Sequence, residues 1–476
     1  MSDMATTSLL DRTIQNLRTA WTGMSDSTRY YLTGAPRPDL PDDDLAKIRQ
    51  HMLDCLEELG GEVSARARAA ELGRSYLSLN ALGRERFLTL LATRFGTDKE
   101  QVEAAVEELR TAKDETARRA AERVLREALI PQYRRLLMRF NALPEGVKFL
   151  VDLRAELLPL ARKTPELADL DADLKSVLSA WFDVGLLELR RITWEAPAVL
   201  LEKLIAYEAV HAIRSWDDMK NRLDSDRRCF AFFHPNMPDE PLIFVEVALV
   251  DGMSDNVQTL LDEHAPASDP KAANTAIFYS ISNAQRGLAG ISFGNFLIKR
   301  VVDLLQSELP NLKTFATLSP IPGFRKWLDA RLDAGESPGL SAAERRALLE
   351  GIGAADDVSD HALITMALGH EGWWDDARVA DNLKAPISKA AARYLTAEKR
   401  RSGITADPVA HFHLSNGARM ERLNWKGDLS SNGLAQSCGL MINYLYKLAD
   451  IDGNHESYTS TGRIATSSSI RALTRG

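Results

Sequence analysis

Between residues 276 and 324 the sequence opens with Ala276-Ile-Phe-Tyr-Ser-Ile281 and closes with Ser319-Pro-Ile-Pro-Gly-Phe324. The opening segment is rich in β-branched and aromatic residues, which is typical of a strand. Residues 296–305 carry apolar side chains at helical spacing, and residues 313–318 again favour a strand. This order predicts a glycine-rich loop at the start of a helix, close to a serine-bearing turn.

Three glycines, Gly287, Gly290 and Gly294, stand between the first strand and the helix. Glycine lets the backbone come close to a ligand, and the free N–H groups and dipole of a helix N-terminus attract a pyrophosphate. The same glycines also suit a turn that binds nothing. The loop is therefore a candidate nucleotide site, with a plain turn as the alternative.

The spacing of these glycines narrows the choice of ligand. It matches neither the phosphate loop that ends in Gly-Lys-Ser/Thr nor the Gly-x-Gly-x-x-Gly dinucleotide fingerprint. It resembles the Gln/Arg-x-x-Gly-x-Gly/Ala loop that holds the pyrophosphate of coenzyme A in GNAT proteins, although Gln285 and Arg286 fit that register imperfectly. Coenzyme A is the expected ligand.

The composition is that of an ordinary globular protein. Of 476 residues, 45% are hydrophobic and 26% are charged, so the chain can bury a large core and form two or more domains. The formal net charge of −8 argues against a nucleic-acid surface. The three cysteines form no Cys-x-x-Cys pair, so neither a zinc site nor a disulfide framework is indicated.

The two ends of the sequence carry no recognised targeting signal. Residues 1–11 lack the basic start and apolar core of a secretory signal, and no apolar run reaches the roughly eighteen residues that span a bilayer. The last residues, Leu473-Thr-Arg-Gly476, differ from the Ser-Lys-Leu peroxisomal signal. We expect a cytoplasmic protein with no membrane or nucleic-acid partner.

The first part of the chain favours helices almost throughout. Residues 100–129 contain few helix breakers, and residues 174–190 keep apolar side chains three and four positions apart. Charge-rich segments such as 118–123 are typical of solvated helix faces, so no chemistry is assigned to them. We expect an all-helical bundle over residues 1–208.

The pattern changes after His211. Two β-rich runs, 228–233 and 242–250, are joined by a short connection, which predicts an antiparallel hairpin. Further strands are expected at 276–282, 313–318, 409–414 and 420–423. Helices are expected as an insertion at about 328–400. The chain as a whole is predicted to be α+β, with a mixed and largely antiparallel sheet in residues 209–476.

Two side chains in this second part are candidates for catalysis. Ser319 follows an expected strand, and Pro320 and Pro322 restrict the backbone beyond it, so its hydroxyl would point in one direction. A held hydroxyl suits catalysis, and it also suits a turn cap. The second candidate is His413, because a neutral histidine beside a rigid serine matches an acid/base pair. A buried structural histidine is the alternative.

Two histidines on one face could hold a metal, and strand alternation would place His411 and His413 on one face. Catalytic zinc commonly takes three protein ligands, and no third ligand stands at a telling spacing. We therefore expect no metal. In the same segment, Asp407 and Asn416 are read as a strand start and a turn, although either could orient the histidine.

Five segments together resemble the malonyl-CoA decarboxylases. They are Ile277–Ser282, Gly294–Arg300, Thr317–Phe324, Asp407–Ala418 and Ser437–Tyr444. The resemblance implies a helical domain, residues 1–208, that mediates oligomer contacts in a homo-oligomer (dimer or tetramer). It also implies a GNAT-like catalytic domain, residues 209–476, that converts malonyl-CoA to acetyl-CoA and carbon dioxide with no metal or organic cofactor.

The same resemblance assigns the site residues. Ser319 and His413 would be catalytic, and Tyr458 would be a supporting tyrosine. Animal members carry an acidic residue where this chain has Ser292, so Ser292, Glu246 or a water would replace that carboxylate. The loop that holds the substrate falls on Ala289, Gly290, Ile291, Ser292, Phe293, Gly294 and Asn295.

The expected chemistry matches these residue types. Loss of carbon dioxide from a malonyl thioester leaves an enolate, whose oxygen a fixed donor would stabilise by roughly 3–4 kcal/mol. Ser319 would contact the malonyl carboxylate or relay its proton, with His413 as its acid/base partner. Two alternatives are an acyl-CoA-dependent N-acyltransferase and a non-catalytic acyl-CoA sensor. The pairing of the Ser319-Pro-Ile-Pro-Gly323 turn with Phe412-His-Leu414 favours decarboxylation over acyl transfer, and the joint presence of Ser319 and His413 argues against a sensor.

Overall fold

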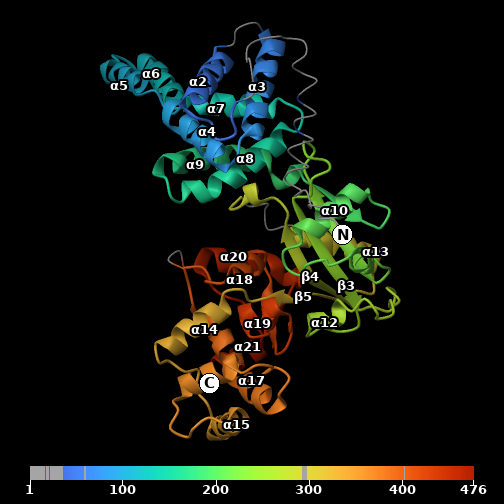
Figure 1. The fold of residues 1–476 in the computed structure, drawn as a ribbon. Coiled ribbons are helices and arrows are strands. Elements are labelled where there is room, and N and C mark those ends of the chain that lie inside the picture. The colour runs from blue at the N-terminus through green and yellow to red at the C-terminus, as the bar shows by residue number, and fades with distance from the viewer. Residues whose placement is uncertain are drawn as a thin grey trace. The chain divides into compact units, whose positions relative to one another are not determined.

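The computed structural model describes residues 36–57, 61–291, 297–400 and 403–475, together with Leu17 and Trp21. The chain divides into two compact units, whose helices and strands are shown in Figure 1. The first unit holds residues 1–188 and two segments that return to it, 233–242 and 284–292. The second unit holds residues 189–232, 243–283 and 293–476. The first part of the glycine-rich loop thus belongs to the helical unit.

The first unit is built of helices, as expected. They are α2 (Asp42–Leu56), α3 (Gly61–Ser78), α4 (Ala81–Arg94), α5 (Lys99–Thr111), α6 (Glu115–Ala128), α7 (Gln132–Asn141), α8 (Gly146–Ala161) and α9 (Pro165–Trp181). Side chains that cap helix N-termini set several boundaries: Asp98 caps α5 and Asp114 caps α6 by accepting backbone N–H bonds. The ring of Phe149 contacts those of Tyr76 and Phe140 in the core of this unit.

One helix ends earlier than its apolar spacing suggested. Helical spacing continues to residue 190, but α9 stops at Trp181. The carboxylate of Asp183 accepts a bond from the N–H of Gly185, which closes a turn instead of another helical turn. The chain then forms a short 3₁₀ turn, Val184–Leu186, and the strand β1 (Glu188–Ile192).

The second unit contains a mixed sheet that is antiparallel except for one pair among the pairings described. Its strands lie in the order β1-β2-β3-β4-β5-β8-β6, and β7 also pairs with β8. The predicted hairpin is confirmed, because Phe230 of β2 lies opposite Val245 of β3. The remaining strands are β2 (Arg227–Phe233), β3 (Ile243–Val250), β4 (Thr275–Asn283), β5 (Thr314–Thr317), β6 (Ser319–Pro320), β7 (Arg419–Asn424) and β8 (Met441–Leu445).

Strands β4 and β5 run parallel and then separate. Their last paired residues are Phe278 and Thr317, and the carbonyl of Phe278 accepts one more bond from the N–H of Leu318. Strand β5 also pairs with β8, and beyond Leu318 the chain keeps only that pairing, with Ser319 opposite Ile442. Because β4 and β5 separate here, Ser319 pairs with β8 and not with β4.

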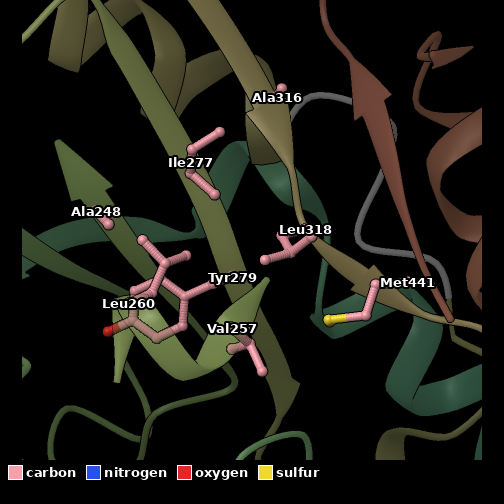
Figure 2. Close-up of a cluster of buried hydrophobic side chains, with 8 residues drawn as sticks. All are labelled: Ala248, Val257, Leu260, Ile277, Tyr279, Ala316, Leu318 and Met441. Carbon is pink, nitrogen blue, oxygen red and sulfur yellow. The ribbon is translucent and has the colours of Figure 1, made fainter. Parts of the chain in front are cut away.

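Buried apolar side chains hold this part of the sheet in place. Figure 2 shows the cluster, which joins β3, β4, β5, β8 and α12 (Val257–Leu260). A β-bulge in β4 contributes to it: consecutive residues Glu246 and Val247 pair with Ser280 and Phe278, which leaves Tyr279 as the extra residue. The members are Ala248, Val257, Leu260, Ile277, Tyr279, Ala316, Leu318 and Met441, none more than 4% exposed.

The second unit also contains helices. The helices expected at about 328–400 are present as α14 (Phe324–Asp333), α15 (Ala342–Ile352), α16 (Asp360–Gly369) and α17 (Ala377–Ala397). The others are α10 (Ala198–Tyr207), α11 (Trp216–Asn221), α13 (Leu297–Glu308), α18 (Pro408–Ser415), α19 (Ser431–Ser437), α20 (Ile451–Thr461) and α21 (Ser468–Thr474). Within the described ranges, no helix has both the length and the apolar character that crossing a bilayer requires.

The strand expected at residues 409–414 is wrong, because this segment forms α18. The side chain of Asp407 accepts bonds from the N–H groups of Val409 and Ala410, and Pro408 occupies the first helical position. An N-cap aspartate followed by proline starts a helix, and this local signal outweighs the alternation of residues 410–414. The strand expected at 420–423 is confirmed as β7.

Candidate active site

The structure brings Ser319 and His413 into direct contact. Ser319 begins β6 and His413 lies in the last turn of α18. The Oγ atom of Ser319 lies 3.0 Å from the Nε2 atom of His413. Both side chains are buried, with 6% of Ser319 and 2% of His413 exposed. A serine and a histidine at this distance can exchange a proton.

The second ring nitrogen of His413 also has a hydroxyl partner. Its Nδ1 atom lies 2.8 Å from the Oη atom of Tyr446, and burial raises the pKa of that phenol well above its ordinary value. If the phenol donates, the proton of neutral His413 sits on Nε2 and faces Ser319. If the phenol accepts, Nε2 is free to take a proton from Ser319. Tyr446 therefore sets which tautomer of the histidine faces the serine.

Burial keeps the imidazole neutral. It lowers the pKa of His413 to about 3, because the charged form would lose its hydration. The ring of Tyr444 stacks on that of His413, with centroids 4.4 Å apart and planes inclined by 25°. Among the described residues, the polar side-chain atoms bonded to the imidazole are the hydroxyls of Ser319 and Tyr446. His413 is thus a neutral proton carrier at physiological pH.

The hydroxyl of Ser319 is held from its other side by Thr317. The two side-chain oxygens lie 2.8 Å apart, and the Oγ1 atom of Thr317 accepts a bond from the N–H of Tyr444. The carbonyl of Thr317 accepts a bond from the amide of Asn443 at 2.8 Å. Strands β5 and β8 therefore fix the direction of the serine hydroxyl, and a chain of polar groups runs from Thr317 to Tyr446.

Asp407 ties the helix that carries His413 to the turn that follows Ser319. One carboxylate oxygen caps α18, and the carboxylate also accepts bonds from the N–H of Gly323 and, at 3.4 Å, from the hydroxyl of Tyr394. A Cβ atom on Gly323 would lie 2.1 Å from the Tyr394 oxygen, so a larger residue there would have to displace the Tyr394 side chain. Burial raises the pKa of Asp407 by more than these hydrogen bonds lower it. Asp407 is thus a helix cap, and its effect on the site is to hold in place the helix that carries His413.

Tyr458, expected as a supporting tyrosine of the substrate site, contacts His411. The hydroxyl of Tyr458 lies 3.0 Å from the Nδ1 atom of His411 and also accepts the N–H of Thr405. His411 and His413 are two residues apart on a helix, so their side chains leave it about 200° apart and do not share a face. The idea that the two histidines face the same way is therefore wrong.

The described part of the substrate-loop assignment comprises Ala289, Gly290 and Ile291. Ala289 and Gly290 are exposed, and Gly290 adopts a left-handed conformation with φ of +74°. The side chain of Gln285 does not face a ligand, because it is buried and donates to the carbonyl of Pro241 at 2.9 Å. The other expected residues, Ser292, Phe293, Gly294 and Asn295, lie outside the described residues.

Glu246, one possible replacement for the acidic residue of animal members, forms an ion pair. Its carboxylate lies 2.9 Å from the guanidinium of Arg222, and both side chains are almost fully buried. Arg222 also pairs with Asp218 of α11 at 2.8 Å. This arrangement makes Glu246 part of a buried charge network in the second unit.

Two tyrosines that contact His413 were not singled out from the sequence. Tyr444 and Tyr446 are two residues apart at the end of β8, so they point to the same face of the sheet, and one ring meets both of them. The alternation Asn443-Tyr444-Leu445-Tyr446 was a usable signal for this. This alternation identifies the tyrosines that contact His413 only once β8 is known to lie beside β6.

Family models and known proteins match this chain over nearly its whole length. Residues 95–182 match the model of the malonyl-CoA decarboxylase N-terminal domain, and residues 185–476 match that of the C-terminal domain. The chain is 38% identical to the mitochondrial malonyl-CoA decarboxylase of Rattus norvegicus over 466 residues, which cover 94% of this chain and 90% of that protein. It is 39% identical to the protein of the same name from Anser anser anser over 422 residues, which cover 85% of this chain and 83% of that one.

A solved structure shows the same relationship in three dimensions. The crystal structure of malonyl-CoA decarboxylase from Rhodopseudomonas palustris superposes with a TM-score of 0.81 at 43% identity, and the match covers 92% of this chain and 100% of that one. That of Agrobacterium vitis gives a TM-score of 0.79 at 41% identity, with 90% and 99% covered. On these matches in sequence and in structure, the chain belongs to the malonyl-CoA decarboxylase family of lyases.

Proposed function

We propose that this chain converts malonyl-CoA to acetyl-CoA and carbon dioxide, with Ser319 and His413 as the pair that handles the proton. The observation that carries the proposal is the 3.0 Å contact between the two side chains in a buried polar chain. The choice of malonyl-CoA as substrate rests on relatives that match along most of the sequence and carry the name malonyl-CoA decarboxylase.

The reaction makes two demands on the site. The bond between the α-carbon and the carboxylate carbon breaks, its electron pair moves into the thioester as an enolate, and carbon dioxide leaves. One proton must then reach the α-carbon, and the overall reaction takes that proton from solvent. A site for this reaction must hold the thioester oxygen and supply the proton in a place that excludes bulk water.

In the proposed mechanism Ser319 delivers the proton. Its hydroxyl, held by Thr317, donates to the α-carbon, and the Nε2–H of neutral His413 returns a proton to the serine oxygen. Tyr446 donates a hydrogen bond to Nδ1 and keeps its proton. A proton taken from solvent then restores the Nε2–H of His413, so the one proton that the reaction consumes comes from water and no side chain stays ionised. The low pKa of His413 supports a neutral histidine in this role, because an imidazolium would be costly at so buried a position.

The substrate would be held by the glycine-rich loop. The exposed backbone of Ala289 and Gly290 offers peptide groups to the phosphates of coenzyme A, as expected from the glycine spacing. We include these residues and Ile291 in the proposed substrate site.

The direct test is to incubate the purified protein with malonyl-CoA in chelator-treated buffer without any amine. We expect acetyl-CoA and carbon dioxide in equal amounts, and loss of both in the His413→Asn variant. If coenzyme A binds but neither product forms, the proposal fails, and a screen with amine acceptors would then test acyl transfer.

A further inference from the structure

A buried arginine of the helical unit grips the glycine-rich loop. Arg154 lies on α8 and is only 1% exposed. Its Nη1 atom donates to the carbonyl of Gly287 at 2.6 Å and to that of Ala289 at 3.0 Å. Its Nε atom donates to the carboxylate of Asp171 on α9 at 2.8 Å. One guanidinium thus binds three acceptors, two of which are backbone groups of the loop.

The loop also touches α8 directly. A Cβ atom on Gly287 would lie 1.7 Å from the carbonyl oxygen of Val151, so this glycine is required by close approach to α8. On the other side, the buried amide of Gln285 donates to the carbonyl of Pro241. All of these residues belong to the first unit. The described part of the loop is therefore a docked element of the helical unit.

Arg154 also determines which backbone groups of the loop point away from α8. In a trans peptide the C=O and the following N–H point in opposite directions. Because Arg154 holds the carbonyl of Ala289, the N–H of Gly290 in the same peptide group is turned away from α8. Gly290 is exposed, and its positive φ suits a backbone that curves around an anion. The arginine thus aims a loop N–H at the accessible side.

We propose that Arg154 is a positioning residue for the coenzyme A part of the substrate, acting through the loop without touching the ligand. The inference rests on the proposed function, since it takes the loop to bind the pyrophosphate oxygens of coenzyme A. It gives the helical unit a part in substrate binding, beyond the oligomer contacts expected of it. Arginine suits the task because its planar fork serves several acceptors at once, which a lysine ammonium cannot do with the same geometry.

The test compares Arg154→Met with a matched control, Asp171→Asn. The control removes the charge partner of Arg154 and leaves its two bonds to the loop. For each variant, kcat and KM for malonyl-CoA, the Kd for coenzyme A by calorimetry and the Tm would be measured. We expect Arg154→Met to raise KM and Kd together by roughly tenfold or more, with kcat within a factor of about three, as for lost ground-state binding. Asp171→Asn should lower Tm and leave KM and Kd unchanged.

A merely structural arginine predicts a different pattern. In that case both variants would lower Tm, and neither would change KM or Kd, which would overturn the proposal. Equal increases in KM for Arg154→Met and Asp171→Asn would also overturn it. Arg154→Lys should recover only part of the stability and of the affinity, because its shorter side chain has one nitrogen and cannot bond Asp171 from one nitrogen and the loop from another.

A second variant covers the case in which Arg154→Met does not fold. Gly287→Ala keeps every charge but forces the loop away from α8. It should raise the Kd for coenzyme A in the same way, and an unchanged Kd in the folded variant would sink the proposal.

Failure of this proposal can be told apart from failure of the proposed function. The wild-type protein decides the function, by releasing carbon dioxide or not. The Kd for coenzyme A decides the role of Arg154, and it can be measured even if no decarboxylation occurs.

Discussion

The Nε2 atom of His413 lies 3.0 Å from the Oγ atom of Ser319, although 94 residues separate them in the sequence. Strand β8 makes this contact possible from both sides. Ile442 of β8 pairs with Ser319, and Tyr446, directly after β8, bonds the far nitrogen of the histidine. The pair is therefore assembled around one strand, and the consequences can be tested residue by residue.

Removal of either member of the pair should abolish most turnover. We expect Ser319→Ala and His413→Gln each to lower kcat by roughly 10²- to 10⁴-fold, the range for a lost acid/base group, in an assay of carbon dioxide release. The double variant should be no slower than the worse single variant, because the two act as one unit. Losses that multiply in the double variant would show independent roles. Ser415→Ala is the matched control, because the hydroxyl of this α18 serine bonds only the carbonyl of Phe412 in the described contacts.

Tyr446→Phe should slow the reaction without weakening substrate binding. The change removes the hydroxyl that bonds Nδ1 of His413, so the tautomer of the ring is no longer set. We expect kcat to fall roughly 10- to 100-fold with KM nearly unchanged. Tyr444→Phe is the control: its ring stacks on His413, but its hydroxyl has no hydrogen-bond partner among the described residues. An equal loss of kcat in both variants would refute the role given to Tyr446.

The buried imidazole should also make stability depend on pH. Because the folded protein lowers the pKa of His413 to about 3, the unfolded chain binds a proton more readily below its ordinary pKa of 6.5. The stability that this group contributes is present above pH 6.5 and is lost as pH falls toward 3, at about 1.4 kcal/mol per pH unit.

The measurement is urea unfolding of the wild type and of His413→Gln at several values of pH between 4 and 8. The variant should lose stability less steeply on acidification. Parallel curves would show that His413 does not carry this linkage. His264→Gln, which changes an exposed histidine, should follow the wild type.

Loss of the cap on α18 should affect both stability and catalysis. Asp407→Ala removes the acceptor for two N–H groups and the link to Gly323, so the free energy of unfolding should fall by about 0.5–2 kcal/mol and kcat should fall as well. Asp407→Asn keeps one acceptor oxygen and should recover much of both.

The matched control for that prediction is Asp98→Ala. Asp98 caps α5 through the same two kinds of bond, to the N–H groups of Glu100 and Gln101, and it lies in the helical unit. Its loss should lower Tm and leave kcat unchanged. If both alanine variants lower Tm alone, Asp407 has no effect on the site beyond stability.

Much of the fold followed from local patterns. The strands at 276–282 and 313–318, the hairpin of β2 and β3, and the helices of the first unit were all predicted, because β-branched runs and helical periodicity act over neighbouring residues. The prediction of a strand at residues 409–414 was wrong for a related reason. Its alternating polar and apolar residues suit a strand, and Asp407-Pro408 suits a strand start as well as the helix cap that the structure shows.

Residue type and spacing were thus enough to predict the α+β class and the strand that leads to Ser319, since both depend on side chains close together in the chain. The expected turn at Ser319 is instead the short strand β6, because Ser319 pairs with Ile442 of β8. The folded structure alone decided that β8 places Tyr446 on the histidine, that Tyr458 serves His411, and that the loop docks on α8 through Arg154, 133 residues from Gly287. Such contacts depend on how whole elements pack, and local patterns carry no information about which distant side chains a fold will bring within 3 Å.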